Sequence, residues 1–226
     1  MNSRTTWLNK FILTILTSFL ISTSLLAGNY TWNGGTSTAW GTSTNWTPNG
    51  TPSTNDTVTI VTGSNNVYIA AKTEVKLLTM TSGTLNLQSN ELSVGANSFF
   101  NGGTVTNGLL TLIGTNHTFA GSTISTKVSA RCTRVFLNGS VFNDSLKIVI
   151  PSTGRVHASK GGNTFNGPVS ITDSAIAGIT LADSLPDIFN STLDLYNAST
   201  ANIFIAHKAT GCQFNGTVSF NGPNIY

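Results

Sequence analysis

Three residues that could perform acid–base chemistry stand at one phase of a sequence repeat. Lys160, Asp183 and His207 each lie eighteen positions after a phenylalanine. If the repeat stacks as coils, these side chains form a column spaced by about 5 Å, the distance between neighbouring strands. A base, an acid and an imidazole at that spacing could carry out general acid–base catalysis. The alternative is a row of exposed compatible charges, which stabilises little. We favour this alternative, because the column lacks the aspartate cluster and second basic residue of a metal-assisted lyase.

The repeat that spaces these residues is marked by a Phe-Asn pair. The pair occurs four times in the C-terminal half, at intervals that grow from twenty-three to twenty-five positions, as Phe142-Asn143, Phe165-Asn166, Phe189-Asn190 and Phe214-Asn215. A period in this range is typical of solenoids, in which each repeat is one coil of a stack. Such folds offer long repetitive surfaces more readily than a single reactive pocket.

Each repeat also predicts two short strands. Four and six positions after the phenylalanine come apolar residues separated by one polar residue: Leu146/Ile148, Val169/Ile171, Leu193/Leu195 and Val218/Phe220. A second alternating pair follows at fourteen and sixteen positions: Val156/Ala158, Ile179/Leu181 and Ile203/Ile205. Alternation with period two indicates strands with one buried face. The fold class predicted is all-β, a parallel β-helix (β-solenoid) whose coils in the C-terminal half have the length of the Phe-Asn interval.

Stacking gives the marker residues a structural interpretation. Phenylalanines at one point of each coil form an aromatic column inside the stack, and asparagines beside them form a ladder of amide hydrogen bonds. Asparagine also tolerates the left-handed backbone of a corner. The differences in coil length fall between the Lys160/Asp183/His207 column and the next phenylalanine, in residues 161–164, 184–188 and 208–213. Because variable loops on one edge often carry contacts, Lys160, Asp183, His207 and Lys208 are the candidate binding residues.

Residues 1–27 have the pattern of a secretory signal peptide: Arg4 and Lys10, an apolar stretch to Leu26, and Ala27 as a small final residue. A membrane anchor is the alternative, since the stretch could nearly span a bilayer. Without this segment, which contains two of the basic residues and none of the acidic ones, the chain is close to neutral. Its sequence pI near 9.0 therefore does not argue for a nucleic-acid partner. No phosphate loop, nucleophile elbow or zinc-type cysteine spacing is present, so we expect no cofactor.

Residues 28–60 are predicted to be an aromatic cap and first strand, and residues 61–226 the solenoid. Trp32, Trp40 and Trp46 suit a cap because the first coil would otherwise expose its core; a carbohydrate platform of exposed rings is the alternative. Residues 61–128 repeat more loosely, and Phe119, which precedes Phe142 by one repeat interval, is interpreted as a degenerate member of the Phe-Asn series. The chain stops soon after Phe214, so we expect the last coil to lack its second strand and the solenoid to be truncated. Cys132 and Cys212 lie at different phases, which predicts no disulfide between them.

A resemblance covers most of residues 29–226. The segments Trp32-Asn-Gly-Gly, Asn45-Trp46, Asp56-Thr-Val-Thr-Ile60 and Ser82-Gly-Thr-Leu-Asn-Leu87, with the Phe-Asn-Gly repeats, resemble the N-terminal part of adhesin-like or autotransporter-like surface proteins of Gram-negative bacteria, particularly of the Bacteroidetes type. The resemblance implies a right-handed parallel β-helix, export to the cell surface, and a non-enzymatic role in adhesion or matrix formation. Glycans or surface proteins are then the partners. The alternative function is a secreted polysaccharide-active β-helix, a lyase or hydrolase.

Overall fold

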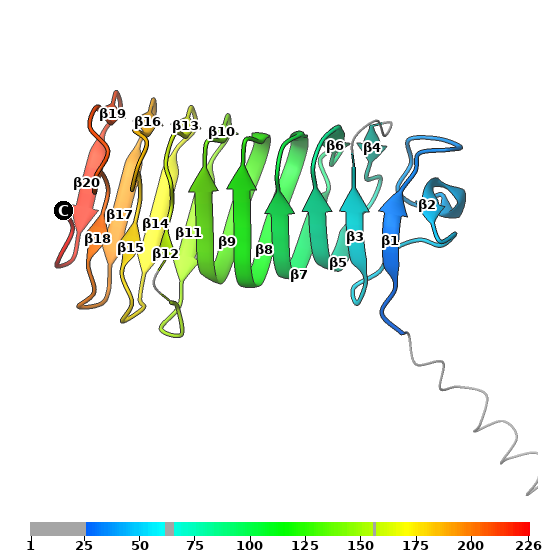
Figure 1. The fold of residues 1–226 in the computed structure, drawn as a ribbon, viewed down its shortest axis with the longest axis horizontal. Coiled ribbons are helices and arrows are strands. Elements are labelled where there is room, and N and C mark those ends of the chain that lie inside the picture. Colours follow the sequence, from blue (N-terminus) through cyan, green and yellow to red (C-terminus); the bar gives the residue numbers. More distant parts are fainter. Residues whose placement is uncertain (1–25, 62–65, 156) are drawn as a thin grey trace, which may run out of the picture.

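The computed structural model describes residues 26–61, 66–155 and 157–226. They form a stack of parallel coils with strands that run side by side along its length (Figure 1). Seventeen of the described strands belong to one hydrogen-bonded sheet that follows the coils, and three, β12, β15 and β18, form a second sheet. The predicted all-β parallel solenoid is confirmed. The signal-peptide interpretation of residues 1–27 falls almost wholly outside the described residues.

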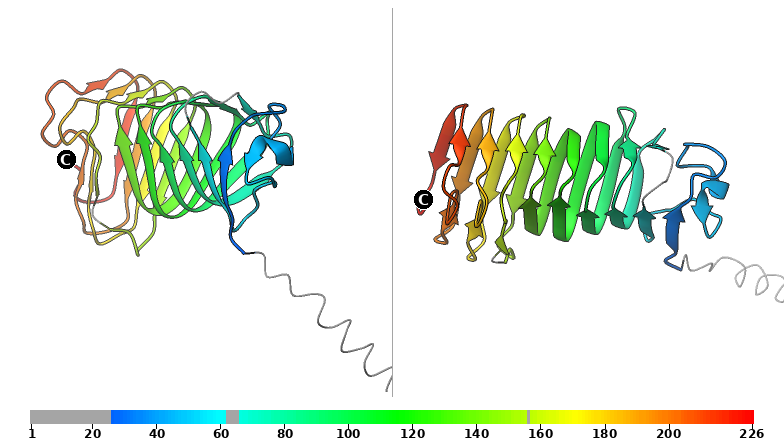
Figure 2. Two further views of the ribbon diagram at one scale, coloured as in Figure 1. Left: turned by 45° about the vertical axis from the view of Figure 1, so that its right-hand side comes forward. Right: turned by 45° about the horizontal axis from the view of Figure 1, so that its top comes forward.

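The strands change in length along the stack. The N-terminal coils contain β1 (Asn29–Trp32), β2 (Trp46–Thr47), β3 (Thr57–Ile60), β4 (Val67–Tyr68), β5 (Thr73–Met80), β6 (Thr84–Asn86), β7 (Glu91–Phe100), β8 (Thr104–Ala120) and β9 (Thr123–Asn138). The C-terminal coils contain β10 (Val141–Phe142), β11 (Leu146–Ile150), β12 (His157–Ala158), β13 (Thr164–Phe165), β14 (Val169–Asp173), β15 (Ile179–Thr180), β16 (Ile188–Phe189), β17 (Leu193–Asn197), β18 (Ile203–Phe204), β19 (Gln213–Phe214) and β20 (Val218–Asn221). Figure 2 shows the same coils obliquely, with the long strands of the middle giving way to shorter ones near the C-terminus.

The register of one column explains this change. Its parallel partners are Val67, Leu85, Val105, Ile124, Phe142, Phe165, Phe189 and Phe214. Neighbours in the column are eighteen to twenty positions apart in the sequence up to Phe142, and twenty-three to twenty-five positions apart after it. The step to longer coils comes after β11: Arg131 and Asn138 are seven positions apart, whereas their partners Val149 and Gly161 are twelve positions apart.

Phe119 is not an early member of the Phe-Asn series, which corrects that interpretation. It pairs with Phe100 on one side and Leu137 on the other, and the residue paired with Phe142 in the preceding coil is Ile124. The spacing of one repeat interval between Phe119 and Phe142 is a coincidence, because the coil at that point is shorter and spans only the eighteen positions from Ile124 to Phe142. The Phe119 ring still meets the Phe142 ring edge-on at 5.2 Å, from a neighbouring position of the core.

The predicted phenylalanine column lies inside the stack. The rings of Phe142, Phe165, Phe189 and Phe214 follow one another at centroid distances of 5.2, 4.7 and 5.3 Å and are nearly parallel. The first three are buried, and Phe214 is 36% exposed. Aromatic rings at these distances add to the free energy gained from burying apolar area.

The second strand pair differs from its prediction in one coil. Ile179, Leu181 and Ile203 are buried, as expected. In the preceding coil, however, His157 faces inward and Ala158 is exposed, the reverse of the predicted alternation. The longer connection between β11 and β12 shifts the phase by one residue, which counting from Phe142 could not reveal. Val156 lies outside the described residues.

The asparagines form the predicted ladder on the outside of the stack. Asn166, Asn190 and Asn215 each donate from Nδ2 to Oδ1 of the asparagine one coil earlier, at 2.8 Å, and Asn143 donates to Ser125 Oγ at 2.9 Å. None of them is among the described residues with positive φ, so the proposed left-handed backbone is wrong. Their contribution is the ladder alone.

The tryptophans form a buried cap, and the alternative of an exposed carbohydrate platform is wrong. Trp32, Trp40 and Trp46 are at most 4% exposed, and Trp46 meets the other two rings edge-on at 4.9 and 4.7 Å. Trp32 ends β1, which stacks parallel on β3, and the segment between β1 and β3 carries the other two tryptophans and the 3-10 helix Ser43–Asn45. Asn45 fixes the segment: its side chain accepts from the N–H groups of Thr36 and Ser37 and donates to Ser37 Oγ and Ala39 O.

At the other end, β20 pairs with β17 and its side chains are exposed. The expectation that the last coil lacks its second strand needs correction, because Ile225 bridges to Ile203 in parallel and Tyr226 exchanges backbone hydrogen bonds with Ile203 and Ile205. A shorter connection brings the chain back sooner than the earlier coils would suggest. Both cysteines are free, as predicted. Among the described residues, no helix has the length and apolar character needed to cross a membrane.

Close stacking makes a sharp prediction for the glycine that follows Asn166. A Cβ on Gly167 would lie 2.4 Å from the carbonyl carbon of Asp144 in the preceding coil, so Gly167→Ala forces two backbones apart. We expect it to lower the free energy of unfolding by about 1–3 kcal/mol, as overpacking does. Gly95→Ala is the matched control, since the nearest atom to its Cβ, Val75 O, is 3.8 Å away. Equal midpoints of urea unfolding for the two variants would contradict this packing.

Candidate functional site

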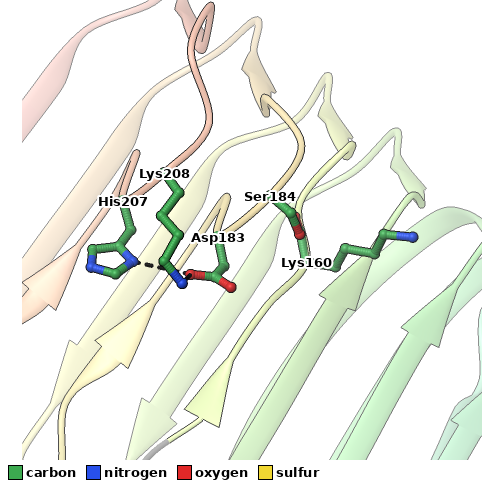
Figure 3. A network of polar contacts seen from close by, with 5 residues as sticks. All are labelled: Lys160, Asp183, Ser184, His207 and Lys208. Atoms are coloured by element: carbon green, nitrogen blue, oxygen red, sulfur yellow. Dashed lines mark hydrogen bonds and ion pairs between the residues drawn. The ribbon is translucent and has the colours of Figure 1, made fainter.

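The candidate binding residues gather around one carboxylate on the edge of the C-terminal coils. Asp183 follows β15, and His207 and Lys208 occupy the matching turn after β18. His207 Nδ1 and Lys208 Nζ both approach Asp183 Oδ1, at 3.0 and 3.1 Å (Figure 3). The side chains are partly to largely exposed, from 28% for Asp183 to 65% for Lys208. Two of the three expected column members therefore meet, joined by Lys208.

Lys160 does not belong to this cluster. Its side chain extends away from Asp183 in Figure 3, and no ion pair joins the two among the described residues. The backbone explains why: Lys160 O accepts hydrogen bonds from the N–H groups of Ser184 and Leu185, so its neighbour in the next coil is Ser184. The predicted three-residue column is wrong by one position at Lys160.

The cause is an insertion at the column itself. Ala158 and Gly161 are three positions apart, but their partners Thr180 and Leu185 are five positions apart. The two added residues lie in the turn of residues 181–184, where Ala182 has a φ of +47°. The segments after the bridge, residues 161–164 and 185–188, are equal in length. The predicted placement of all length differences beyond the column is therefore wrong for this coil.

The electrostatics of the cluster suit an ion pair more than a catalytic acid. The hydrogen bond from His207 and then that from Lys208 hold the pKa of Asp183 below its ordinary value. A carboxylate in this state accepts hydrogen bonds but does not deliver a proton. A second carboxylate is absent from the contacts of the cluster, and no group of three metal-ligating side chains occurs within the described ranges.

A polar column that the sequence pattern did not predict lies inside the stack, two positions before Ile124 and before each phenylalanine of the series. The backbone N–H of Ser122 donates to Ser140 Oγ at 3.1 Å, that of Ser140 to Asn163 Oδ1 at 2.9 Å, and that of Asn163 to Asp187 Oδ1 at 2.8 Å. Asp187 N continues the series to Cys212 Sγ at 3.4 Å. Each N–H is thus satisfied by the equivalent side chain of the next coil, as buried donors require. Lining up the residues by the phenylalanine register would have exposed it.

Asp187 is the weak member of this inner polar column. It is fully buried, and burial raises its pKa to about 6, against the effect of the hydrogen bonds from Asn163. Its Oδ1 accepts from Asn163 N and Nδ2, while Oδ2 has no partner among the residues described. Protonation of this oxygen would remove a buried charge that has no counter-ion in the column, which is what makes the neutral form favourable.

Comparisons of the chain with protein-family models, with curated proteins and with solved structures find no match.

The raised pKa predicts that Asp187 weakens the fold at neutral pH. Because its folded-state pKa lies above the unfolded value near 3.8, its stabilising contribution is present at low pH and is lost as pH rises through about 6. Asp187→Asn keeps an acceptor for Asn163 and cannot ionise. We expect it to raise the free energy of unfolding at pH 7.5 by about 3 kcal/mol relative to the parent, and by less than about 1 kcal/mol at pH 4.

Chemical unfolding of the parent and of Asp187→Asn between pH 4 and 8 measures the difference between their free energies of unfolding. All other titrating groups are common to the two proteins, so their contributions cancel in this difference. Asp194→Asn is the control, since Asp194 is an exposed carboxylate on the neighbouring strand β17. A pH-independent difference for Asp187→Asn, or one equal to that of the control, would contradict the assignment.

Proposed function

We propose that the chain is a non-enzymatic secreted or cell-surface scaffold that contacts glycans or surface proteins over several coils. The observation that carries the proposal is that the polar side chains form hydrogen bonds from one coil to the next. The outer asparagines bond to each other, the inner polar column bonds coil to coil, and Asp183 bonds to the next coil through His207. Residues that hold a stack together serve its length and rigidity.

The outward rows of the long sheet support this proposal. One outward row of side chains runs in register from strand to strand along the stack: Ser93, Thr111, Ser129, Lys147, Ser170, Asp194 and Ser219. Hydroxyls repeated at the strand spacing of about 4.8 Å are suited to hydrogen bonding with a polymer that also carries hydroxyls. A contact surface of this kind needs no catalytic group.

A polysaccharide-cleaving enzyme is the second candidate, and Asp183 with His207 is the one cluster that favours it. His207 Nδ1 lies 3.0 Å from Asp183 Oδ1 at an exposed edge of the stack. This is hydrogen-bond distance, at which a carboxylate can orient an imidazole that acts as a base. The cluster lacks the paired carboxylates that glycoside hydrolysis uses. We therefore propose a structural role for this cluster, as an ion pair that joins two neighbouring coils.

Incubation of the purified chain with polygalacturonate, hyaluronate and xylan tests the two functions directly. We expect no increase in reducing ends and no ultraviolet absorbance from unsaturated products, because the cluster holds a single carboxylate, which His207 and Lys208 keep ionised. Retention of the chain on at least one of these polymers, immobilised, is the positive result expected of a scaffold. Cleavage that disappears in Asp183→Asn but persists in Asp194→Asn would overturn the proposal and establish the enzyme.

A further inference from the structure

The charges of the chain are nearly balanced in number but not in position. Of the basic residues in the stack, six fall within residues 121–160: Lys127, Arg131, Arg134, Lys147, Arg155 and Lys160. Asp144 is the one acidic residue in the same stretch. The near-neutral total of the sequence therefore conceals a basic region in the middle of the stack, between β9 and β12 in Figure 1.

Three of these cations share one face of the long sheet. Lys127 and Arg131 are exposed on β9, on either side of Ser129, and Lys147 is exposed on β11 opposite Ser129. Residues two apart along a strand are separated by about 6.6 Å, and strands by about 4.8 Å. The Lys147 side chain therefore projects beside the gap between Lys127 and Arg131, which makes a triangle of positive charge on a flat surface.

Two arginines extend the triangle around the adjacent corner. Arg134 follows Arg131 by three positions on β9, and Arg155 lies in the next coil, where its N–H donates to Thr133 O at 3.2 Å. With Thr115, Asn116, Thr133 and Thr153 these two arginines line an open hollow of about 360 Å³. Arg134 Nε is enclosed there and has no hydrogen-bond partner among the residues that the structure describes. We call Lys127, Arg131, Lys147, Arg134 and Arg155 the basic band.

The basic band is not neutralised within the described part of the chain. The ion pairs found there involve Lys72 with Glu74 and Glu91, and Asp183 with His207 and Lys208, all in other coils. Asp144 lies beside Lys127 at the edge of a separate hollow, and its Oδ1 accepts from Ser145 N. Five like charges on two successive coils repel one another, so an anion that bridges them gains from all five.

We propose that the basic band binds a linear anionic polysaccharide, one that carries sulfate or carboxylate groups. This inference rests on the proposed scaffold function, for which it names the class of ligand. Sulfate and carboxylate oxygens accept from the arginines and lysines, and the ring hydroxyls meet Ser129 and the threonines of the hollow. Single-stranded nucleic acid is a poorer fit, because its sites pair cations with aromatic stacking platforms. The large exposed aromatic side chains of the described residues, Tyr196, Phe214, Phe220 and Tyr226, all lie in later coils.

Binding of heparin, polygalacturonate, neutral dextran and an oligodeoxynucleotide to the purified chain tests the proposal. The test variant is Arg131→Ser with Lys147→Ser, since serine already occupies outward positions of this sheet at Ser129 and Ser170. The matched control is Lys72→Ser with Lys76→Ser, which removes the same charge from an earlier coil. We expect the parent to bind at least one anionic polysaccharide, with affinity that falls as salt rises, and the test variant to bind about tenfold more weakly. The control should change affinity by less than about twofold, because its lysines lie outside the basic band.

Equal losses in the two variants, or no binding of heparin and polygalacturonate by the folded parent, would overturn the basic band as a site. Tighter binding of the oligodeoxynucleotide than of either polysaccharide would overturn the ligand class. These failures differ from failure of the scaffold itself. If the chain binds dextran without cleaving it and does not bind the anionic polymers, the scaffold function stands and the basic band as a site is wrong. If the chain cleaves polygalacturonate, the scaffold function is wrong, whichever residues bind the polymer.

Discussion

The structure depends on one constraint, which is that each residue lies about 4.8 Å from its own counterpart in the next coil. A side chain in such a stack must be compatible with a near copy of itself above and below. Phenylalanine satisfies this condition by ring stacking and asparagine by an amide ladder, and these two residues mark the C-terminal coils. The same constraint explains why Gly167 follows Asn166: the backbone of Asp144 comes too close for any Cβ.

Charged side chains meet the constraint in a different way, because identical charges cannot stack without repulsion. On the outside, Asp183 pairs with His207 and Lys208 of the next coil, and Lys147, Ser170 and Asp194 follow one another in a single row. On the inside, the column from Ser122 to Asp187 contains a single carboxylate, whose burial favours its protonated form. The basic band breaks the pattern, since its cations lie on adjacent coils and none of them forms an ion pair within the described residues, and this exception is what points to a ligand.

Features that repeat at a nearly constant interval could be predicted from the sequence. Four Phe-Asn pairs and the alternating apolar residues after them predicted a parallel solenoid, an inner aromatic column and an outer amide ladder, and all of these are confirmed. Three tryptophans near the start predicted a cap, which the buried rings confirm. Phe119 is followed by Ala120, whereas every phenylalanine of the series is followed by Asn. This difference agrees with the position of Phe119 in another column.

The wrong predictions are those that depend on where a coil gains or loses residues. Residue counting carries the phase correctly along a strand but not across a connection of changed length. The loop between β11 and β12 turned His157 inward in place of Ala158, and the turn before Leu185 moved Lys160 away from Asp183. The basic band was hidden for a related reason: net charge is a sum over the chain, whereas the register decides which charges become neighbours.

The central claim, that neighbouring coils stack in a single defined register, is tested most directly by cysteine cross-linking on the outer face. In a Cys212→Ser background, Ser170→Cys with Asp194→Cys places two thiols at directly paired positions of β14 and β17. Ser170→Cys with Tyr196→Cys displaces the second thiol by two further positions on the same face, beyond the reach of a disulfide. This register predicts rapid formation of an intramolecular disulfide in the first variant and little in the second, measured by mass spectrometry of the monomer after mild oxidation. Equal cross-linking of both pairs, or preference for the second, would contradict the register of the stack.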